Sequence, residues 1–492
     1  MIKKLQFMLI IQMVIFGGAQ ALPNPSQDVR VKKVYDHLQN QLIWVKNGEW
    51  SPCAQTLMET LSHVEEEGLW VDDYAPFIQA VQKEDLKNPG AQTRADQLLT
   101  LAALNYIYDM KGERLNPHMV NNDIYVKPDS VDPADLLMGY LSLPDQCGWI
   151  YALAPTSADY QKLKQLLALY REKQAKGGWP TLPPGTKLQK GDSGPLVETL
   201  RAQLIAQDAL SPEGGSQEQF DDALVEAVKT YQTRHGLEHD GKVGGGTLKA
   251  LNTSVDERIH SIIVSLERQR WYPNPLPARY LQVNIPGFYL KGVEGGATVI
   301  SMPIITGKEY RKTPVFNAPM TEIIFNPSWH VPASIMPEIL PKMESNPEAY
   351  ASKGYHWDGD RIVQSPGNAN SLGKIKFNIK SPFSVYLHGT PNHNLFSKAK
   401  RALSHGCIRV ENPYKLAEFV FHDPNTWNQE RIKDEASGTT TKPVKLNTPL
   451  PVFVTYLTVF EDEDHKFHFV EDEYAQDKAI WAALVKAKRN VQ

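Results

Sequence analysis

The sequence is poor in cysteine and has no excess of positive charge. It contains 3 cysteines among 492 residues, and 52 Lys and Arg residues against 56 Asp and Glu residues give a net charge of -4. A nucleic-acid-binding protein typically shows a strong basic excess, so this balance gives no support for nucleic acid as a partner. Internal repeats and low-complexity tracts are also absent. The apolar fraction of 41% is that of a globular protein, and the length predicts about three domains.

Long hydrophobic runs are missing after the first 21 residues, so no later stretch is expected to span a membrane. Residues 1–21 contain two lysines, a short apolar run and an Ala-Gln-Ala pattern, which together are typical of a secretory signal peptide. An uncleaved anchor is the alternative, and only then would the chain contact a membrane. We expect the mature chain to begin near Leu22 and to work outside the cytoplasm.

The three cysteines form an odd set. In an oxidising compartment this predicts one disulfide and one free thiol. Cys53 and Cys147 both lie in the N-terminal third and would pair if the fold brought them together, which the sequence does not decide. Cys407 would then stay unpaired, and a free thiol in such a compartment calls for a chemical role.

The first two domains are expected to be helical. Apolar residues recur at helical spacing through residues 22–180, which predicts a helical scaffold domain. Glycine and proline cluster over residues 177–185 and mark a boundary. Residues 187–253 predict three short helices joined by glycine turns, which form a small bundle.

Residues 255–492 form the third domain, which begins with a helix over 256–271 and then changes to strand periodicity. Strands are expected at 281–285, 297–305, 321–325 and 385–388, a hairpin at 452–460 and 466–470, and helices at 413–421 and 474–488. Residues 332–374 are rich in Pro, Gly, Asn and Ser around one short helix, and a long insert of this kind is more often a lid than idle. The fold class is therefore multidomain α+β, with a mostly-β third domain that carries a loop-rich capping insert.

Residues able to do chemistry gather near the end of the third domain. His388 ends an expected strand, and Ser404-His405-Gly406-Cys407 follows in a glycine-kinked turn. A thiol attacks as thiolate, and with an unperturbed pKa of about 8.5 it needs a neighbouring base or positive charge at neutral pH. His388 and His405 are both candidates for that base, and the pattern alone does not choose between them.

Metal binding is the rival chemistry, because His388, His405 and Cys407 are all competent zinc ligands. A structural zinc site needs a complete tetrahedral set of ligands, and the stretch has no second cysteine, no HExxH helix and no pair of histidines at finger spacing. We therefore expect no metal and no cofactor.

His388 followed by Ser404-His405-Gly406-Cys407-Ile408-Arg409 resembles the signature of the L,D-transpeptidase (YkuD-type) catalytic domain. The resemblance extends to the large periplasmic, YcbB-like branch of that family through Phe325-Asn326-Pro327-Ser328-Trp329, Leu372-Gly373-Lys374-Ile375-Lys376-Phe377 and Val385-Tyr386-Leu387-His388. Residues 187–253 are similar to the peptidoglycan-binding module of cell-wall enzymes through Phe220-Asp221, His235-Gly236-Leu237, Asp240-Gly241 and Thr247-Leu248.

The resemblance implies a role for each residue of the signature. Cys407 would be the nucleophile and His388 its base, with the backbone carbonyl of Gly389 orienting the imidazole. The backbone N–H groups of Gly406 and Cys407 would form the oxyanion hole. Several relatives carry Ser in place of His405, so His405 is not expected to be the essential base.

Substrate-binding roles are expected for a second group of residues. Arg409 would fix the turn or pair with a substrate carboxylate, and Ser404 and His405 belong to the turn that presents the thiol. Tyr386 and Trp329 would line the pocket, with ordinary core packing as an equal alternative.

A basic cluster, Lys398, Lys400 and Arg401, stands just before the turn. The cluster would either attract the anionic substrate or form a solvated helix face, and the solvated face is favoured.

The resemblance implies a peptidoglycan transpeptidase that forms 3–3 crosslinks between diaminopimelate residues through a cysteine thioester. Its partners would be peptide stems, glycan and other cell-wall enzymes, and it would be carbapenem-sensitive and contribute to cell shape. The alternatives are an L,D-carboxypeptidase or endopeptidase, or a lipoprotein-to-peptidoglycan transferase, using the same thiol. A non-catalytic wall-binding scaffold is the alternative of another class, against which the intact Cys407 and His388 argue.

Overall fold

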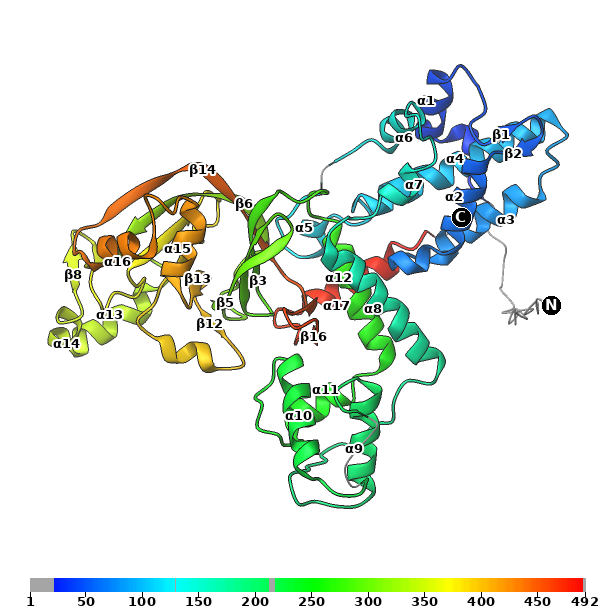
Figure 1. Ribbon diagram of the computed structural model, residues 1–492. Coiled ribbons are helices and arrows are strands. Elements are labelled where there is room, and N and C mark those ends of the chain that lie inside the picture. Colours follow the sequence, from blue (N-terminus) through cyan, green and yellow to red (C-terminus); the bar gives the residue numbers. More distant parts are fainter. Residues whose placement is uncertain (1–21, 129, 212–216, 490–492) are drawn as a thin grey trace.

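The computed structural model describes residues 22–128, 130–211 and 217–489. The signal-peptide prediction for residues 1–21 therefore lies outside the described residues. Figure 1 shows three lobes: an N-terminal helical lobe, a small helical lobe and a β-rich lobe, which meet around the helices α8 and α12. Among the helices of the described ranges, none is long and apolar enough to cross a membrane.

The N-terminal lobe is built around one long helix, α4 (Pro89–Met110), which is largely buried from Ala95 onward. Around it lie α1 (Val29–His37), α2 (Pro52–Ser62), α3 (Ala75–Lys83), α5 (Pro117–Val120), α6 (Pro133–Leu141), α7 (Trp149–Ala152), the 3-10 helices η1 (Pro25–Gln27), η2 (Val64–Glu67) and η3 (Val71–Asp73), and the hairpin β1 (Val45–Lys46) and β2 (Glu49–Trp50). Asp96 of α4 is buried, and its carboxylate accepts the backbone N–H groups of Ile43, Trp44 and Val45 at 2.7–2.9 Å, which offsets the cost of burying the carboxylate. The carboxylate thereby ties the hairpin to α4.

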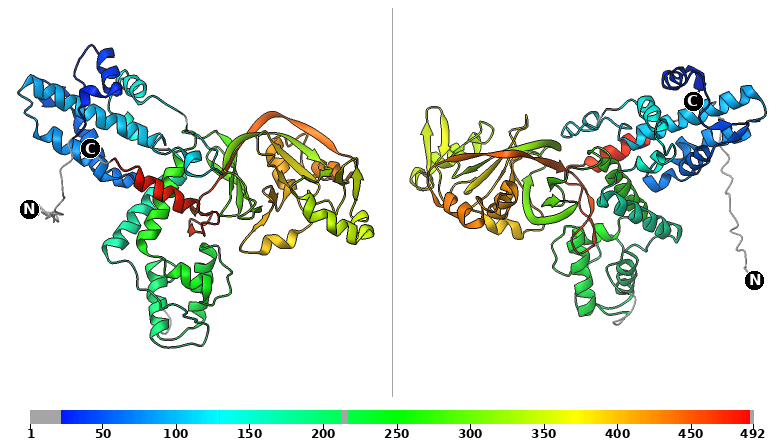
Figure 2. Two further views of the ribbon diagram at one scale, coloured as in Figure 1. Left: turned by 180° about the vertical axis from the view of Figure 1, so that it is seen from behind. Right: turned by 45° about the horizontal axis from the view of Figure 1, so that its top comes forward.

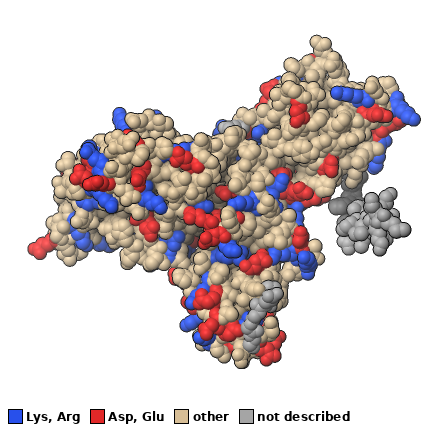
Figure 3. Space-filling model, in the orientation of Figure 1, with Lys and Arg blue, Asp and Glu red and all other residues tan. Residues whose placement is uncertain are grey.

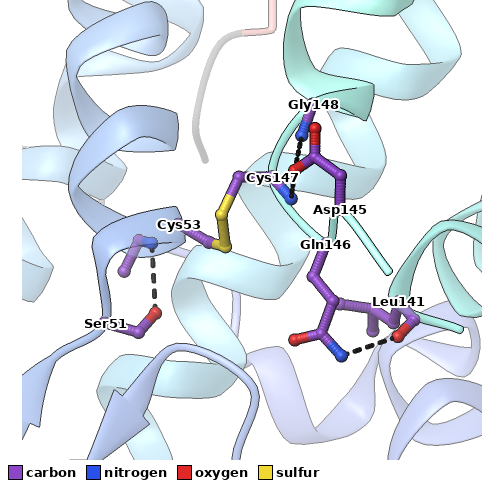
Figure 4. Close-up of a disulfide and its surroundings, with 8 residues drawn as sticks. Ser51, Cys53, Leu141, Asp145, Gln146, Cys147 and Gly148 are labelled. Carbon is purple, nitrogen blue, oxygen red and sulfur yellow. Dashed lines mark hydrogen bonds between the residues drawn. A yellow bond between two sulfur atoms is a disulfide. The ribbon is translucent and has the colours of Figure 1, made fainter. Parts of the chain in front are cut away.

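A disulfide joins Cys53 in α2 to Cys147 in the loop before α7, as Figure 4 shows. The two residues are 94 positions apart in sequence. The pairing that the sequence left open is therefore present, and Cys407 is the free cysteine. A crosslink across so long a loop stabilises the lobe chiefly by restricting the unfolded chain.

The small lobe is a three-helix bundle, as expected, with α9 (Pro195–Ala206), α10 (Asp222–Arg234) and α11 (Gly245–Leu251). The buried amide of Gln232 donates to Asp240, to the Lys242 carbonyl and to Thr247 at 2.8–3.0 Å, so α10 organises the glycine turn. The long helices α8 (Ala158–Ala175) and α12 (Val255–Gln269) pack together between the two helical lobes (Figure 1). The C-terminal helix α17 (Gln476–Lys486) packs on α12 and leads back toward the N-terminal lobe (Figure 2).

The β-rich lobe contains a nine-stranded sheet in the order β12-β5-β13-β11-β10-β6-β14-β3-β4, and β4 also pairs with β5, so the sheet closes on itself. Its strands are β3 (Arg279–Asn284), β4 (Tyr289–Glu294), β5 (Ala297–Gly307), β6 (Phe316–Phe325), β10 (Ile375–Ile379), β11 (Leu387–His388), β12 (Ala402–Ser404), β13 (Ile408–Val410) and β14 (Lys442–Thr455). Helices α15 (Pro413–Phe421) and α16 (Gln429–Ser437) and the 3-10 helix η4 (His393–Ser397) complete it. The multidomain α+β fold class is confirmed.

The expected C-terminal hairpin differs from the structure. The hairpin expected at 452–460 and 466–470 is shorter, with β15 (Val459–Glu461) pairing β16 (Phe467–Phe469). Residues 452–455 instead belong to β14, which runs parallel to β3 and antiparallel to β6. The alternation of side chains at 452–455 fits either the hairpin or β14, so only the tertiary contacts decide between the two pairings.

The capping insert is more ordered than its composition suggested. It contains α13 (Met336–Ser345), α14 (Pro347–Ala351), β8 (Tyr355–Asp358) and β9 (Arg361–Gln364), and β9 pairs both β8 and β7 (Trp329–His330). Its small core includes Trp329, Tyr355 and Ile362.

Candidate active site

One cavity of about 750 Å³ lies between the sheet and the capping insert. It is lined by eight of the nine residues that the sequence singled out: Trp329, Tyr386, His388, Ser404, His405, Gly406, Cys407 and Arg409. The ninth, Gly389, supplies a backbone carbonyl next to His388. The structure thus brings all of the expected site residues together.

Strand pairing places the nucleophile beside the histidine. β11 and β13 run parallel in the middle of the sheet, with Leu387 opposite Ile408 and His388 opposite Arg409. Leu387 and Ile408 are fully buried, so this pairing is anchored in the core. Cys407 directly precedes β13, and its position therefore follows from the register of two buried strands.

His388 is buried and held by its own backbone. Its Nδ1 lies 2.6 Å from the carbonyl oxygen of Gly389, which only accepts hydrogen bonds, so Nδ1 carries the proton and Nε2 holds the lone pair. Burial, together with the positive charges of Arg409 and Lys376, lowers the pKa of His388 to about 3. The imidazole is therefore neutral at physiological pH and keeps Nε2 as a base.

Cys407 is half-buried, and its Sγ donates to the carbonyl of Ser384 at 3.9 Å. Burial raises the pKa of the Cys407 thiol, although hydrogen bonds from Tyr386 and the charges of Lys376 and Arg409 act in the opposite direction. The resting pair is therefore a neutral thiol and a neutral imidazole rather than an ion pair. No hydrogen bond joins Cys407 to His388 among the described residues.

The turn before Cys407 is held from both sides. Gly406 has φ of 111°, and a Cβ there would lie 3.3 Å from the carbonyl oxygen of Lys312. Ser404 Oγ donates to the Cys407 carbonyl at 2.6 Å and accepts the Gly406 N–H at 3.1 Å. Thr313 Oγ1 donates to the Gly406 carbonyl at 2.8 Å. Within the described ranges, the N–H of Cys407 has no acceptor.

Two cations near the thiol have no carboxylate partner in the described part of the chain. Arg409 is half-buried with an unsatisfied Nε, and burial lowers its pKa. Lys376 of β10 lies opposite His388 in register, and its Nζ stands 4.0 Å from the centre of the Tyr386 ring. Burial lowers the pKa of Lys376. Lys376 was not singled out from the sequence, because its alternation with buried Ile375 and Phe377 is that of any strand.

The insert covers the pocket through two sets of contacts. The indole N–H of Trp329 donates to the Tyr386 hydroxyl, which also faces the Cys407 sulfur. On the other side, Glu338 of α13 accepts His405 Nε2 at 2.9 Å and Arg311 at 3.2 Å. His405 therefore connects the turn to the insert, and the pKa of Glu338 is lowered by its hydrogen bond to His405.

The basic cluster lies away from this pocket. Arg401 donates to the backbone carbonyls of Ile304, Lys398 and Phe288, and Lys400 pairs with Glu473 at 2.9 Å. Lys398 and Arg401 line a different cavity, near the small helical lobe. These residues follow η4 as an irregular segment, so the favoured prediction of a solvated helix face is wrong. The cluster also does not line the cavity that contains Cys407.

The described residues give little support for a metal ion or for a strongly charged ligand. Searching the described ranges finds no group of three or more His, Cys, Asp or Glu residues that could hold a metal ion. Figure 3 shows Lys and Arg interspersed with Asp and Glu on the face drawn, without one dominant sign.

Comparison with known families assigns three parts of the chain. The YkuD family model, described as "L,D-transpeptidase catalytic domain", matches residues 278–440. Residues 193–251 match a "Putative peptidoglycan binding domain", and residues 29–167 match a "Scaffold domain".

Individual relatives agree with these assignments over part of their length. A Haemophilus influenzae protein named "Putative L,D-transpeptidase" is 29% identical over 220 residues, which cover 40% of this chain and 44% of that protein. The Bacillus licheniformis N-acetylmuramoyl-L-alanine amidase CwlL is 40% identical over 67 residues, or 14% of this chain and 19% of that protein. The chain thus spans less than half the length of these curated relatives.

Solved structures with similarity include L,D-transpeptidases of Xylanimonas cellulosilytica and Stackebrandtia nassauensis. The first is 17% identical with a TM-score of 0.18 and covers 56% of this chain and 100% of that one. The second is 14% identical with a TM-score of 0.22 and covers 56% and 97%. TM-scores this low support no conclusion about the fold. The family matches identify this chain as one that carries an L,D-transpeptidase catalytic domain of the YkuD type together with a peptidoglycan-binding domain.

Proposed function

We propose that this protein is a periplasmic peptidoglycan L,D-transpeptidase that forms 3–3 crosslinks between diaminopimelate residues through a Cys407 thioester. The observation that supports this most is the pairing, in one covered pocket, of a free thiol with a neutral imidazole whose Nδ1 is fixed by Gly389. The carbonyl takes the orienting place that a carboxylate holds in other catalytic triads.

In the first step Cys407 attacks the carbonyl at the L-centre of diaminopimelate in a donor tetrapeptide stem. The thiol proton passes to His388 Nε2 as the S–C bond forms. The C–N bond to the terminal D-Ala then breaks, and His388 returns the proton to the leaving amine. Because the resting thiol is neutral, attack and proton transfer are concerted, and Sγ turns from Ser384 toward His388.

The Cys407 amide is the stronger oxyanion donor of the expected pair. The N–H of Gly406 is engaged by Ser404 Oγ, whereas that of Cys407 is free to bind the developing oxyanion. A rotation of the Ser404 hydroxyl would release Gly406 as the second donor. Ser404 thus positions the turn rather than contacting substrate.

Arg409 and Lys376 suit an anionic donor stem. Both are half-buried cations without a carboxylate partner in the described structure, and both lower the cost of a negative sulfur or oxyanion nearby. Tyr386 and Trp329 form the wall beside the thiol, and His405 holds the insert over it. The insert excludes water from the thioester, which favours an amine as the second nucleophile.

The peptidoglycan-binding domain would keep the enzyme on the wall, where stems are abundant and other cell-wall enzymes act. The first-step chemistry is shared with an L,D-carboxypeptidase or endopeptidase and with transfer to a lipoprotein lysine, since these differ only in the second nucleophile. A non-catalytic scaffold would need neither the free thiol nor its oriented imidazole.

Incubation with purified tetrapeptide muropeptides tests the proposal. Wild-type protein should give dimers joined 3–3, and Cys407→Ala should give none, as read by mass spectrometry of the products. Tripeptide alone would assign hydrolysis, and unchanged substrate with retained binding to sacculi would assign a scaffold. A carbapenem should add one acyl group at Cys407, as read from the intact mass. An unmodified wild-type protein would contradict the carbapenem sensitivity expected of this chain.

A further inference from the structure

An extended arm from the N-terminal lobe forms part of the wall of the catalytic pocket. Residues 121–126 run beside the start of β6, where Ile124 makes a parallel bridge with Val315. The N–H of Tyr125 donates to the Val315 carbonyl at 2.7 Å, and the N–H of Val315 donates to the Asp123 carbonyl at 2.9 Å. The arm is therefore fixed to the β-rich lobe by backbone hydrogen bonds.

Side chains of the arm alternate between the core and the pocket. Ile124 and Val126 are 1% and 3% exposed and belong to the hydrophobic core of the β-rich lobe. Asp123 and Tyr125 point the other way and line the cavity that contains Cys407. This period of two is that of a strand with one buried face, so burial of Ile124 and Val126 orients the two pocket residues.

Asp123 keeps an unused acceptor. Lys312 Nζ binds its Oδ2 at 2.9 Å, and Oδ1 has no partner among the described residues. The other carboxylate that lines the cavity, Glu338, is already bound by His405 and Arg311. A carboxylate can accept several hydrogen bonds, so Asp123 offers a binding position for a cationic amine.

Tyr125 lies on the thiol side of the arm. Its ring centre is 4.2 Å from that of Phe383 and 4.8 Å from that of His118, yet the residue remains 44% exposed. The residue after Phe383 is Ser384, whose carbonyl is 3.9 Å from Cys407 Sγ. Tyr125 and Cys407 line the same cavity, so the exposed part of the Tyr125 ring is available to a cationic group bound there.

We propose that Asp123 and Tyr125, contributed by the scaffold domain, form the subsite for the cationic amine of the acceptor. The assignment rests on the proposed function, because it concerns the second half of that reaction. The ammonium group binds Asp123 and loses one proton to solvent. The amine nitrogen then attacks the thioester carbonyl. A C–N bond forms, the C–S bond breaks, and the second proton passes through His388 to the sulfur.

The test separates the two half-reactions. Acyl-enzyme is formed with a tetrapeptide donor and followed by intact mass, and it is then partitioned between water and a diaminopimelate-containing tripeptide acceptor. In Asp123→Asn the ratio of amide product to hydrolysed donor should fall about fivefold to tenfold, with a higher KM for the acceptor. In Tyr125→Leu the same ratio should fall about threefold, and Tyr125→Phe should restore it.

Two further variants exclude a merely structural effect. Lys312→Met removes the same ion pair but leaves the Asp123 carboxylate, so the partition should be retained. Asp135→Asn breaks a comparable ion pair with Lys33, 2.6 Å long, elsewhere in the N-terminal lobe, and should change nothing.

The outcomes are distinct. If wild-type protein forms no acyl-enzyme, the proposed function fails. If acyl-enzyme forms but Asp123→Asn keeps the wild-type partition, or Lys312→Met loses it equally, the acceptor subsite is overturned.

Discussion

The floor of the catalytic pocket consists of β11, β13 and the turn at 405–407, whereas its roof is the insert helix α13. In the floor, Leu387, Ile408 and Val410 are fully buried, and each contributes about 1.5–3 kcal/mol by leaving water. Helix α13 has no fully buried residue, packs on the insert's own small core and contacts the floor turn through Glu338. Exposed ion pairs of this kind contribute little. The molecule thus fixes the groups that do chemistry and leaves their cover easy to displace.

The same contrast separates the two histidines. His388 belongs to the floor, where burial keeps it neutral and Gly389 sets its tautomer. His405 faces the roof and binds Glu338. Substitutions in the floor should therefore affect the chemical step, and substitutions in the roof should affect substrate binding.

Replacing His388, the proposed base in the floor, should have the largest effect on the rate of acylation. His388→Asn should slow acylation of Cys407 by about 100- to 10,000-fold, because the neutral thiol then has no proton acceptor. Intact-mass kinetics with a carbapenem or a tetrapeptide donor measure this rate. His405→Asn, in the turn where the floor contacts the roof, is the matched control. A similar loss in both variants, or a near-normal rate in His388→Asn, would erase the distinction between the two histidines.

The pH dependence of alkylation tests whether the floor holds a neutral pair. The thiol pKa is raised, so thiolate forms only as pH rises, and the rate with iodoacetamide should increase roughly tenfold per pH unit between about pH 7 and 9. His388 is already deprotonated far below this range, so no step should occur near the ordinary histidine pKa of about 6.5. Because Cys53 and Cys147 are paired, only Cys407 reacts. A plateau from about pH 5 to 7 would indicate a thiolate–imidazolium pair instead.

The turn at Gly406 tests how rigid the floor must be. Gly406→Ala places a Cβ 3.3 Å from the Lys312 carbonyl at φ of 111°, so the turn and the Cys407 amide should shift. Acylation should slow by about tenfold. Gly177→Ala provides the control, because that glycine has φ of 92° with open space around it, so strain arises there without touching the site. Equal rates in Gly406→Ala and wild type would show that the turn tolerates movement.

The smallest effect is expected from loosening the roof. Glu338→Gln weakens the contacts with His405 and Arg311, so the KM for the donor should rise about threefold while kcat changes little. Steady-state kinetics of D-Ala release provide both constants. Glu344→Gln, an exposed acid on the same helix, serves as control. A fall in kcat alone would instead show that Glu338 takes part in the chemical step.

Some of this organisation could be read from residue patterns. The helices at 413–421 and 474–488 and the strands near 281, 297 and 321 are confirmed within a few residues, since each has a clear period and flanking turn residues. The strand expected at 385–388 is only Leu387–His388, and the chain enters this segment from a turn at Ser384, where φ is 52°.

Other features gave no usable sequence signal. Residues 121–126 read Asn-Asn-Asp-Ile-Tyr-Val, which has no polar–apolar alternation, and they stand between helices within the predicted scaffold domain. Lys376 and Glu338 look like ordinary surface charges until strand pairing and the folded insert place them beside Cys407 and His405.

The sequence by itself determined the reactive segment, because Ser404, Gly406 and Cys407 act through a local turn whose geometry depends on neighbouring residues. It also determined the helical and strand composition of the three lobes. Tertiary structure alone decided that Cys53 meets Cys147, that His388 rather than His405 is buried with a fixed tautomer, and that Asp123 and Tyr125 reach the pocket. These features depend on strand register and on burial between distant segments, which a local pattern of residues does not specify.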